Sequence, residues 1–438
     1  MEFSKGDSFI LKGKEAKIID VLGEGGQGEV YLVSYNNHHY AFKYYKKTPS
    51  EDFIYNLKTN ISKGSPSPDF LWPKEMAEFD DDTYGYLMDL RPKNYVSFVS
   101  YLTGTNRFKN QTTLLNWCIE LVKSFKLLHE RGYSYQDLND GSFFLDKETG
   151  DLLICDNDNV TADKRNLGVL GKMRYMAPEI VRGDKLRKNG PRQMPDTHSD
   201  RFSLAIILFL ALCLGNPFEG RCLKKYMIID EKAEYEMFGS NPIYIYNELD
   251  SSNRPIRGYH SAVINRYPLL PSYIKAAFQR TFVDGLKDRE NGRTTELEWL
   301  RLLCRYRDEL ITCSCGNEYI FGFNEKKHNS RCPYCKLPTR KFCYLNIGKH
   351  KILLEPGKLL YEFHIDKYSS NYNTSIGEVI INKNNPSLWG ILMKIPCLVL
   401  LKDKAGKEKS ISKGGVIPIV DGLKIKFNPN TVGEILTN

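Results

Sequence analysis

The chain has 438 residues, 41% of them hydrophobic and 26% charged. This length is enough for two or three domains, because single domains rarely exceed about 250–300 residues. The formal net charge is +9, from 62 basic and 53 acidic residues, and this moderate excess favours anionic ligands without indicating a nucleic-acid binder. The longest apolar run, residues 202–215, is shorter than the ~20 residues that span a bilayer, and no apolar leader opens the chain. We therefore expect a cytoplasmic protein that is not associated with a membrane.

A glycine-rich stretch lies between two expected strands near the start of the chain. Residues 15–45 alternate apolar and polar side chains, and the stretch GEGGQGEV at residues 23–30 interrupts this pattern. Dinucleotide-binding folds use a similar glycine string, but there a helix follows it, whereas β-type residues follow it here. The sequence therefore predicts a glycine-rich hairpin folded over phosphates. The residues expected around a bound nucleotide in this region are Gly23, Gly25, Gly28, Val30, Ala41 and Lys43.

Three elements are expected between this hairpin and residue 131. Residues 50–62 have helical periodicity, with Ser50 as the expected N-cap. Residues 84–90 are strand-like and lead into a hinge. Residues 112–131 form an amphipathic helix.

Two acidic sites follow this helix. Tyr135-Gln136-Asp137 lies five positions before Ser142, and a β-branched run ends in Asp156-Asn157-Asp158. We expect a hairpin between the two sites. Taken alone, each aspartate fits an ordinary polar turn between strands. Three further motifs lie beyond them: Ala177-Pro178-Glu179, Asp200 before the apolar run, which we expect to be a buried helix, and Arg293 before a helix expected over residues 295–308.

In their order and spacing these motifs resemble the protein kinase fold over approximately residues 10–310. The chain resembles bacterial eukaryotic-like (Hanks-type) serine/threonine kinases. More narrowly, it resembles the branch found in tellurium-resistance-type triads, encoded beside a metal-dependent protein phosphatase and a von Willebrand A-type protein. The resemblance implies an α+β, bilobal kinase domain over residues 1–310, with an N-lobe at 1–89 and a C-lobe at 92–310.

The resemblance also implies cofactors and roles. It implies ATP with Mg²⁺ or Mn²⁺, and transfer of the γ-phosphoryl group to hydroxyls of protein substrates. Lys43 would bind the α- and β-phosphates, Asp137 would orient the acceptor hydroxyl, and Asp156 with Ser142 would hold magnesium. Glu51 is a weak candidate for the helix glutamate that pairs with Lys43. The backbone at Asp89 and Arg91 would face the adenine, Asp200 would bind the catalytic-loop backbone, and Arg293 would pair with Glu179.

The sequence also departs from the family pattern. Gln136 replaces the arginine that reads a phosphate on the activation segment, so we expect weak or absent switching by phosphorylation of that segment. Asn139 replaces a lysine, and Ser142 replaces the metal-binding asparagine. Asn139 or Asp158 is a candidate for a further metal ligand, because magnesium prefers oxygen ligands. We expect Lys172 to steady the transferring phosphoryl group in place of the missing lysine; the competing interpretation is that Lys172 faces solvent or a substrate acid.

Four of the eleven cysteines cluster in the tail. Cys313 and Cys315 are separated by sixteen residues from Cys332 and Cys335. This spacing predicts a zinc ribbon over residues 311–341, in which four thiolates form a closed structural Zn²⁺ site. The seven other cysteines are scattered, as expected in a reducing compartment.

Residues 342–438 are rich in β-type sequence and in turn signals, which predicts a small β-sandwich. The segments 376–381 and 421–427 resemble a forkhead-associated domain. Glu378 stands where such domains place a phosphate-binding arginine, so we expect a docking module without ordinary phosphopeptide binding.

The leading hypothesis is an active protein serine/threonine kinase whose tail recognises partners or substrates. The resemblance adds a cognate phosphatase and a von Willebrand A-type protein as partners. The alternatives are a nucleotide-binding pseudokinase or signalling scaffold, favoured by Asn139 and Ser142, and a nucleic-acid-associated ribbon protein, which rests on charge and zinc alone.

Overall fold

The computed structural model describes residues 3–25, 28–165, 167, 171–183, 194–323, 329–369, 371–372, 374–400 and 408–438. The chain divides into two compact units. The first comprises residues 1–109, 116–268 and 275–300, and the second comprises residues 110–115, 269–274 and 301–438. The domain boundaries expected after residues 310 and 341 fall inside the second unit and stay predictions.

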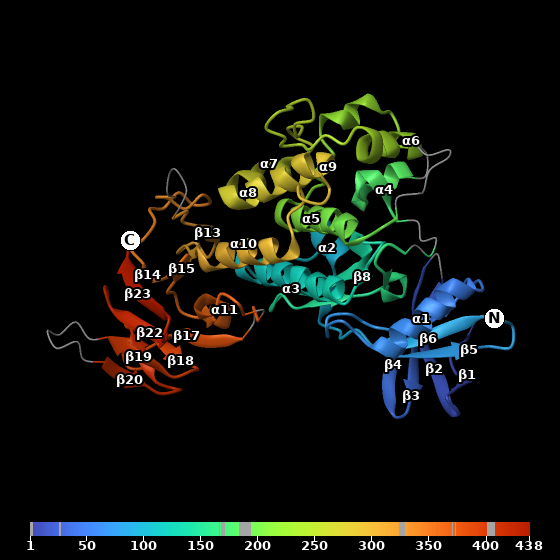
Figure 1. Ribbon diagram of the computed structural model, residues 1–438, viewed down its shortest axis with the longest axis horizontal. Coiled ribbons are helices and arrows are strands. Elements are labelled where there is room, and N and C mark those ends of the chain that lie inside the picture. Colours follow the sequence, from blue (N-terminus) through green and yellow to red (C-terminus); the bar gives the residue numbers. More distant parts are fainter. Residues whose placement is uncertain are drawn as a thin grey trace. The chain divides into compact units, whose positions relative to one another are not determined.

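The first unit begins with a six-stranded antiparallel sheet, drawn in blue in Figure 1. The alternation predicted over residues 15–45 is observed, because one face of the sheet packs on a core that includes Tyr31, Val33 and Phe42. The strand order is β1 (Ser8–Leu11), β2 (Lys14–Glu24), β3 (Gly28–Tyr35), β4 (His38–Tyr45), β6 (Tyr84–Asp89) and β5 (Glu75–Glu78).

Helix α1 (Glu51–Lys63) packs beside this sheet and confirms the helix expected over residues 50–62. The Ser50 hydroxyl caps it by accepting the Phe53 N–H at 3.3 Å. Its buried residues include Leu57 and two amides, Asn56 and Asn60. Buried amides on a helix need hydrogen-bond partners, so this face is built to contact polar groups.

Helices form most of the rest of the first unit. Helix α5 (Thr197–Cys213) is the predicted buried helix, and the Asp196 side chain caps it by accepting the Ser199 N–H at 3.0 Å. Among the described helices, none is both long and apolar enough to cross a membrane. The other helices from residue 98 to residue 308 are α2 (Phe98–Leu102), α3 (Gln111–Glu130), α4 (Pro178–Gly183), α6 (Glu231–Tyr235), α7 (Ser261–Arg266), α8 (Ser272–Gln279), α9 (Gly285–Lys287) and α10 (Glu296–Asp308).

Short strands position the two acidic sites. The predicted hairpin is formed by β9 (Phe143–Asp146) and β10 (Leu152–Ile154), and β7 (Tyr95–Ser97) pairs with β9. A second small ladder joins β8 (Tyr133–Ser134) to β11 (Thr161–Ala162). The segments that carry Asp137 and Asp156 therefore each begin from a strand.

The second unit is mostly β-structure. Its first hairpin consists of β12 (Leu310–Thr312) and β13 (Glu318–Ile320). Beyond it lie two antiparallel sheets with a common core, to which Leu345 and Ile435 contribute from one sheet and Val379 and Ile391 from the other. This arrangement confirms an all-β region at the C-terminal end.

The sheets are ordered as follows. The larger sheet contains β15 (His350–Leu353), β14 (Cys343–Ile347), β23 (Thr431–Thr437), β22 (Lys424–Asn428), β19 (Cys397–Leu400) and β20 (Glu408–Ile411). The smaller contains β16 (Leu359–Tyr361), β17 (Ser375–Ile381), β18 (Trp389–Met393) and β21 (Val416–Pro418), and the short helix α11 (Glu362–Ile365) follows β16.

Candidate active site

Asp137 lies in the loop that follows β8. The backbone of Gln136 is left-handed, with φ of +70°, a conformation that few non-glycine residues adopt. The Tyr135 N–H donates to Asp200 Oδ2 at 2.7 Å, which is the backbone contact that the resemblance implied for Asp200. Asn139 Nδ2 donates to Asp137 Oδ1 at 3.1 Å. Burial raises the pKa of Asp137, although this hydrogen bond opposes the shift.

Cys155 follows β10 directly, and Asp156 is the next residue. Its backbone is also left-handed, with φ of +56°, and its side chain is 49% exposed. The Cys155 N–H donates to the Ser142 carbonyl at 2.9 Å, so the two acidic segments are joined by a backbone hydrogen bond. The Ser142 hydroxyl, in contrast, is buried. Of these two residues, expected to hold magnesium, Asp156 therefore has the accessible side-chain oxygens.

Lys43, on β4, is buried next to two carboxylates. Its Nζ lies 2.8 Å from Asp158 Oδ2 and 3.5 Å from Asp156 Oδ1. Burial lowers the pKa of Lys43, but the charges of Asp158 and Asp156 outweigh burial and raise it overall. The lysine is therefore charged, as an ammonium that binds phosphates must be.

The expectation for Glu51 is not what the structure shows. Among the residues that the structure describes, the carboxylates within 4 Å of Lys43 Nζ belong to Asp156 and Asp158. Glu51 is exposed at the first turn of α1, where acidic side chains stabilise the helix dipole. Asp158, which we considered as a candidate for a further metal ligand, is the buried partner of Lys43. In the sequence, the only hint of this pairing is a second aspartate two positions after Asp156.

The glycine-rich stretch forms the predicted hairpin between β2 and β3. Gly23 pairs with Val30, and the Gly25 N–H donates to the Gly28 carbonyl at 2.8 Å; residues 26 and 27 lie outside the described residues. A Cβ added at Gly28 would lie 2.0 Å from the Tyr44 carbonyl, so this glycine is required by the close approach of β4. At Gly23 a Cβ would meet nothing within 4 Å.

Two of the residues expected around the nucleotide, Ala41 and Val30, belong to one apolar cluster. Ala41 and Met88 are buried in it, and Val30, Leu90 and Leu153 pack against them. Asp89 ends β6, and the Arg91 side chain donates to the Tyr95 carbonyl at 2.8 Å. The strand and hinge expected over residues 84–92 are thus present, beside a surface of the apolar kind that binds an adenine ring.

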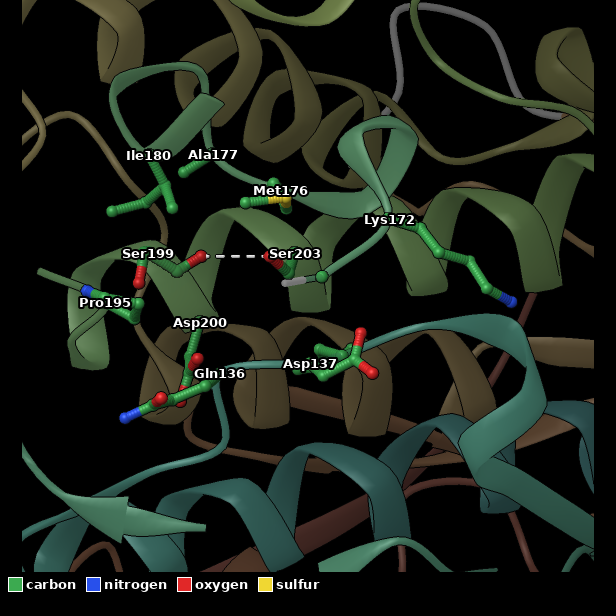
Figure 2. Close-up of a pocket in the computed structure, with 12 residues that line it drawn as sticks. Gln136, Asp137, Lys172, Met176, Ala177, Ile180, Pro195, Ser199, Asp200 and Ser203 are labelled. Carbon is green, nitrogen blue, oxygen red and sulfur yellow. Dashed lines mark hydrogen bonds between the residues drawn. The ribbon is translucent and has the colours of Figure 1, made fainter. Parts of the chain in front are cut away.

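Lys172 lies near Asp137, the expected catalytic aspartate, but forms no hydrogen bond or ion pair with it among the described contacts. In Figure 2 its side chain extends away from the Asp137 carboxylate. Its Nζ donates to Asn139 Oδ1 at 3.3 Å and lies 3.6 Å from Asp140 Oδ1. Because Asn139 in turn donates to Asp137, Lys172 and Asp137 are connected through the asparagine that replaces the family lysine.

The activation segment is held by Gln136. The Gln136 Nε2 donates to the Thr161 hydroxyl and to the Arg165 carbonyl. Between Asp158 and Glu179 the sequence offers only Thr161 and Tyr175 as hydroxyl side chains, and they are 0% and 2% exposed. Because both hydroxyls are buried, neither is readily accessible for phosphorylation. This is consistent with the expectation of weak or absent switching by phosphorylation of this segment.

A buried network of charged side chains contacts the Asp137 loop through Asp200. His129 Nε2 lies 3.0 Å from Asp200 Oδ2, and His129 Nδ1 lies 2.9 Å from Glu296 Oε1. Burial alone would lower the pKa of His129, but the two hydrogen bonds and charges raise it to about 9. Burial is likewise outweighed at Glu296, where His129 and Arg201 lower the pKa to about 2. No local sequence signal marks His129 as part of such a network.

This network predicts a pH-dependent stability. The folded-state pKa of His129 lies above its unfolded value of about 6.5, so its contribution is complete below pH ~6.5 and is lost as the pH rises through about 9. We expect the free energy of unfolding to fall by about 3 kcal/mol over this range from this group. Denaturant unfolding of the wild type and His129→Gln at several pH values measures the difference. Equal slopes for the two proteins would contradict the prediction.

Arg293 and Glu179 form the predicted pair. The Arg293 Nη1 and Nη2 atoms donate to the two Glu179 carboxylate oxygens at 2.9 and 2.8 Å. Arg293 is 1% exposed. Burial opposes ionisation, but the Arg293 hydrogen bonds lower the pKa of Glu179. This two-point contact fixes the end of the activation segment.

The four tail cysteines come together as the spacing predicts. Their Sγ atoms all lie within 4.8 Å of one another, with Cys313 3.5 Å from Cys335 and Cys315 3.9 Å from Cys332. Sulfurs bound tetrahedrally at about 2.3 Å from a zinc ion would be about 3.8 Å apart. Their positions therefore suit a zinc ion.

A second group, Asp308, His350 and His364, does not suit a metal. His364 Nδ1 accepts the Tyr361 N–H at 3.0 Å, so its proton is on Nε2, which lies 3.0 Å from Asp308 Oδ2. Both ring nitrogens are then occupied by hydrogen bonds. We interpret this group as a buried structural His–Asp pair.

The comparisons with known proteins agree with this geometry. The model of the protein kinase domain family matches residues 16–257, more than half of the chain. Protein kinase YegI of Escherichia coli is 25% identical over 236 residues, which cover 53% of this chain and 34% of YegI. Human ribosomal protein S6 kinase alpha-2 is 26% identical over 257 residues, which cover 55% of this chain and 32% of that protein. The match thus spans about a third of the length of these relatives.

Among solved structures, the PknI kinase domain of Mycobacterium tuberculosis matches with a TM-score of 0.45 at 15% identity, covering 69% of this chain and 98% of that domain. The family match is the finding that decides the class of protein. The chain belongs to the protein kinase domain family.

Proposed function

We propose that this chain is an ATP- and magnesium-dependent protein serine/threonine kinase that transfers the γ-phosphoryl group to protein hydroxyls. The observation that carries the proposal is the juxtaposition of Lys43 with Asp156 at 3.5 Å, together with the backbone hydrogen bond that joins the Asp156 segment to the loop of Asp137. Phosphoryl transfer depends mainly on positioning and charge neutralisation, and these three side chains supply both.

The residues present fit ATP and magnesium. The space beside Gly23 is open, Lys43 is a buried cation, and the apolar cluster around Ala41 suits a base. The accessible Asp156 carboxylate is a hard oxygen ligand of the kind that Mg²⁺ or Mn²⁺ takes, with water and phosphate oxygens in the remaining positions. When bound, the metal neutralises charge on the phosphates. Asp137 would accept the hydrogen bond of the acceptor hydroxyl and take its proton, while Lys43 would hold the α- and β-phosphates.

The test is transfer of labelled γ-phosphate from ATP by the full chain, to itself or to an acceptor protein such as casein, with and without magnesium. Magnesium-dependent labelling of serine or threonine is the expected result. Tight nucleotide binding without transfer would favour the alternative of a pseudokinase or signalling scaffold. Asn139 and the buried Ser142 hydroxyl are the observations that favour that alternative.

Lys172 is expected to contribute through charge. In Lys172→Met the rate at saturating ATP and substrate should fall about tenfold, because a cation near the transferring group is lost while the Lys43 contact remains. Lys172→Arg keeps the charge and should retain most of the rate. An undiminished rate in Lys172→Met would show that the side chain, which is 59% exposed, merely faces solvent.

The tail is proposed as a docking region. The Cys313, Cys315, Cys332 and Cys335 cluster would hold structural Zn²⁺, and the two-sheet region would be a forkhead-associated-like module. Glu378 forms an ion pair with Lys394 at 3.6 Å. Glu378 stands where forkhead-associated domains place a phosphate-binding arginine, so an acidic side chain occupies the position where a phosphate would otherwise bind. The resemblance adds a cognate phosphatase and a von Willebrand A-type protein as partners, and the scattered cysteines suit a cytoplasmic location.

A further inference from the structure

The ammonium of Lys43 is held by the same segment that carries Asp156. The carboxylate nearest to it, Asp158, lies two residues after Asp156 and contacts Nζ at 2.8 Å. The side chain of Asp158 is 0% exposed and that of Lys43 is 8% exposed. A buried charge is costly unless it is paired and hydrogen-bonded, so each of these groups depends on the other.

A tyrosine completes the surroundings of Asp158. The Tyr45 hydroxyl donates to the same oxygen, Oδ2, at 2.6 Å. Burial and the Asp158 charge raise the pKa of Tyr45 well above its usual value, so the phenol stays a donor. Asp158 Oδ2 thus accepts from two donors on β4, Lys43 and Tyr45, so Asp158 is the hydrogen-bonded partner of Lys43 in this structure.

Helix α1 contacts this segment through amides. Asn56 and Asn60 lie one turn apart on one face of the helix, and each donates its Nδ2 to the Val160 carbonyl at 2.8 Å. Val160 is two residues beyond Asp158. The helix therefore fixes the backbone of the segment and supplies no charge to Lys43. The acidic residues at its start lie elsewhere: Glu51 is exposed, and Asp52 pairs with Arg165 at 3.0 Å.

We propose that Asp158 is the positioning residue that holds Lys43 toward the phosphates, in place of a carboxylate from helix α1. The inference rests on the proposed nucleotide-binding function and deepens it. In this proposal the carboxylate that pairs with Lys43 comes from the Asp156–Val160 segment. The pair therefore does not depend on a charged residue that movement of α1 would bring to Lys43. The helix acts on Lys43 indirectly, through Val160 and through the packing of Phe53 on Tyr45.

A double-mutant cycle on nucleotide affinity tests the proposal. Magnesium-ATP is titrated calorimetrically into the full chain and into Asp158→Asn, Lys43→Met and the double variant. If Asp158 acts through Lys43, Asp158→Asn weakens binding about tenfold alone but by less than about twofold in the Lys43→Met background, because contacting residues are not additive. A merely structural role gives losses that add, and additive losses would overturn the proposal.

Two further variants, one at an exposed residue and one at a neighbour of Asp158, keep the test decisive if Asp158→Asn folds poorly. Glu51→Gln should bind within about twofold of the wild type, whereas a tenfold loss would show that the helix carboxylate holds Lys43 and would overturn the proposal. Tyr45→Phe removes one donor to Asp158 but keeps the Lys43–Asp158 pair, so it should weaken binding less than Asp158→Asn does. Binding needs no phosphoryl transfer, so a wild type that binds ATP but transfers nothing would refute the kinase function alone. A wild type that binds no ATP would overturn both.

Discussion

Asp137→Asn should reduce phosphoryl transfer by about 10²–10⁴-fold, the contribution typical of a positioned acid or base. Asparagine has nearly the same shape as aspartate and keeps a carbonyl oxygen for the Asn139 hydrogen bond. It cannot take the proton of the acceptor hydroxyl at the start of transfer. Because Asp137 does not contact Lys43 in the described structure, ATP affinity should change by no more than a few-fold.

Single-turnover labelling separates these two effects, since it measures the chemical step after ATP has bound. Asp151→Asn is the matched control: Asp151 is an exposed aspartate at the turn of the β9–β10 hairpin, and its loss should leave transfer unchanged. Transfer that survives in Asp137→Asn at near wild-type rate would show that another group orients the hydroxyl.

Loss of the proposed zinc site should have the largest effect on stability. Cys332→Ser removes the most buried of the four thiols, at 0% exposure, and we expect the protein to lose its zinc. Structural zinc sites supply about 10–16 kcal/mol of apparent binding energy in small zinc-binding peptides, which exceeds the ~2–5 kcal/mol of a typical core truncation. The apolar cluster around Cys332, formed with Ile311, Tyr319, Phe342 and Leu353, should then loosen.

Elemental analysis for zinc and thermal unfolding with and without a chelator measure this effect. One zinc per chain and a chelator-dependent fall in the unfolding temperature are expected for the wild type. Cys343→Ser is the control, because Cys343 lies in the same unit but is not one of the four clustered cysteines. A metal-free protein with unchanged unfolding temperature would contradict the zinc assignment.

Local signals in the sequence predicted most of the elements. The alternation over residues 15–45 and the helical periodicity of residues 50–62 and 112–131 arise because one face of each element meets a core, and that face repeats with the period of a strand or helix. The cysteine cluster followed from residue type and spacing, and the Arg293–Glu179 pair followed from the resemblance to the kinase family. The cysteine cluster is recoverable because four thiols at ribbon spacing have a characteristic pattern.

The partners of buried charges were decided by the tertiary structure. The resemblance implied a helix carboxylate for Lys43, with Glu51 as a weak candidate, but the three-dimensional path of the chain brings Asp158 to Lys43 and leaves Glu51 in solvent. His129 gave no signal, because nothing local indicates that a histidine at the end of α3 will meet Asp200 and Glu296 from two other helices. The sequence by itself determined the fold family, the order of the motifs and Asp137 and Asp156 as the acidic sites. Only the tertiary structure decided which charges surround Lys43 and His129, because electrostatic pairing depends on distance and burial, which a linear pattern does not contain.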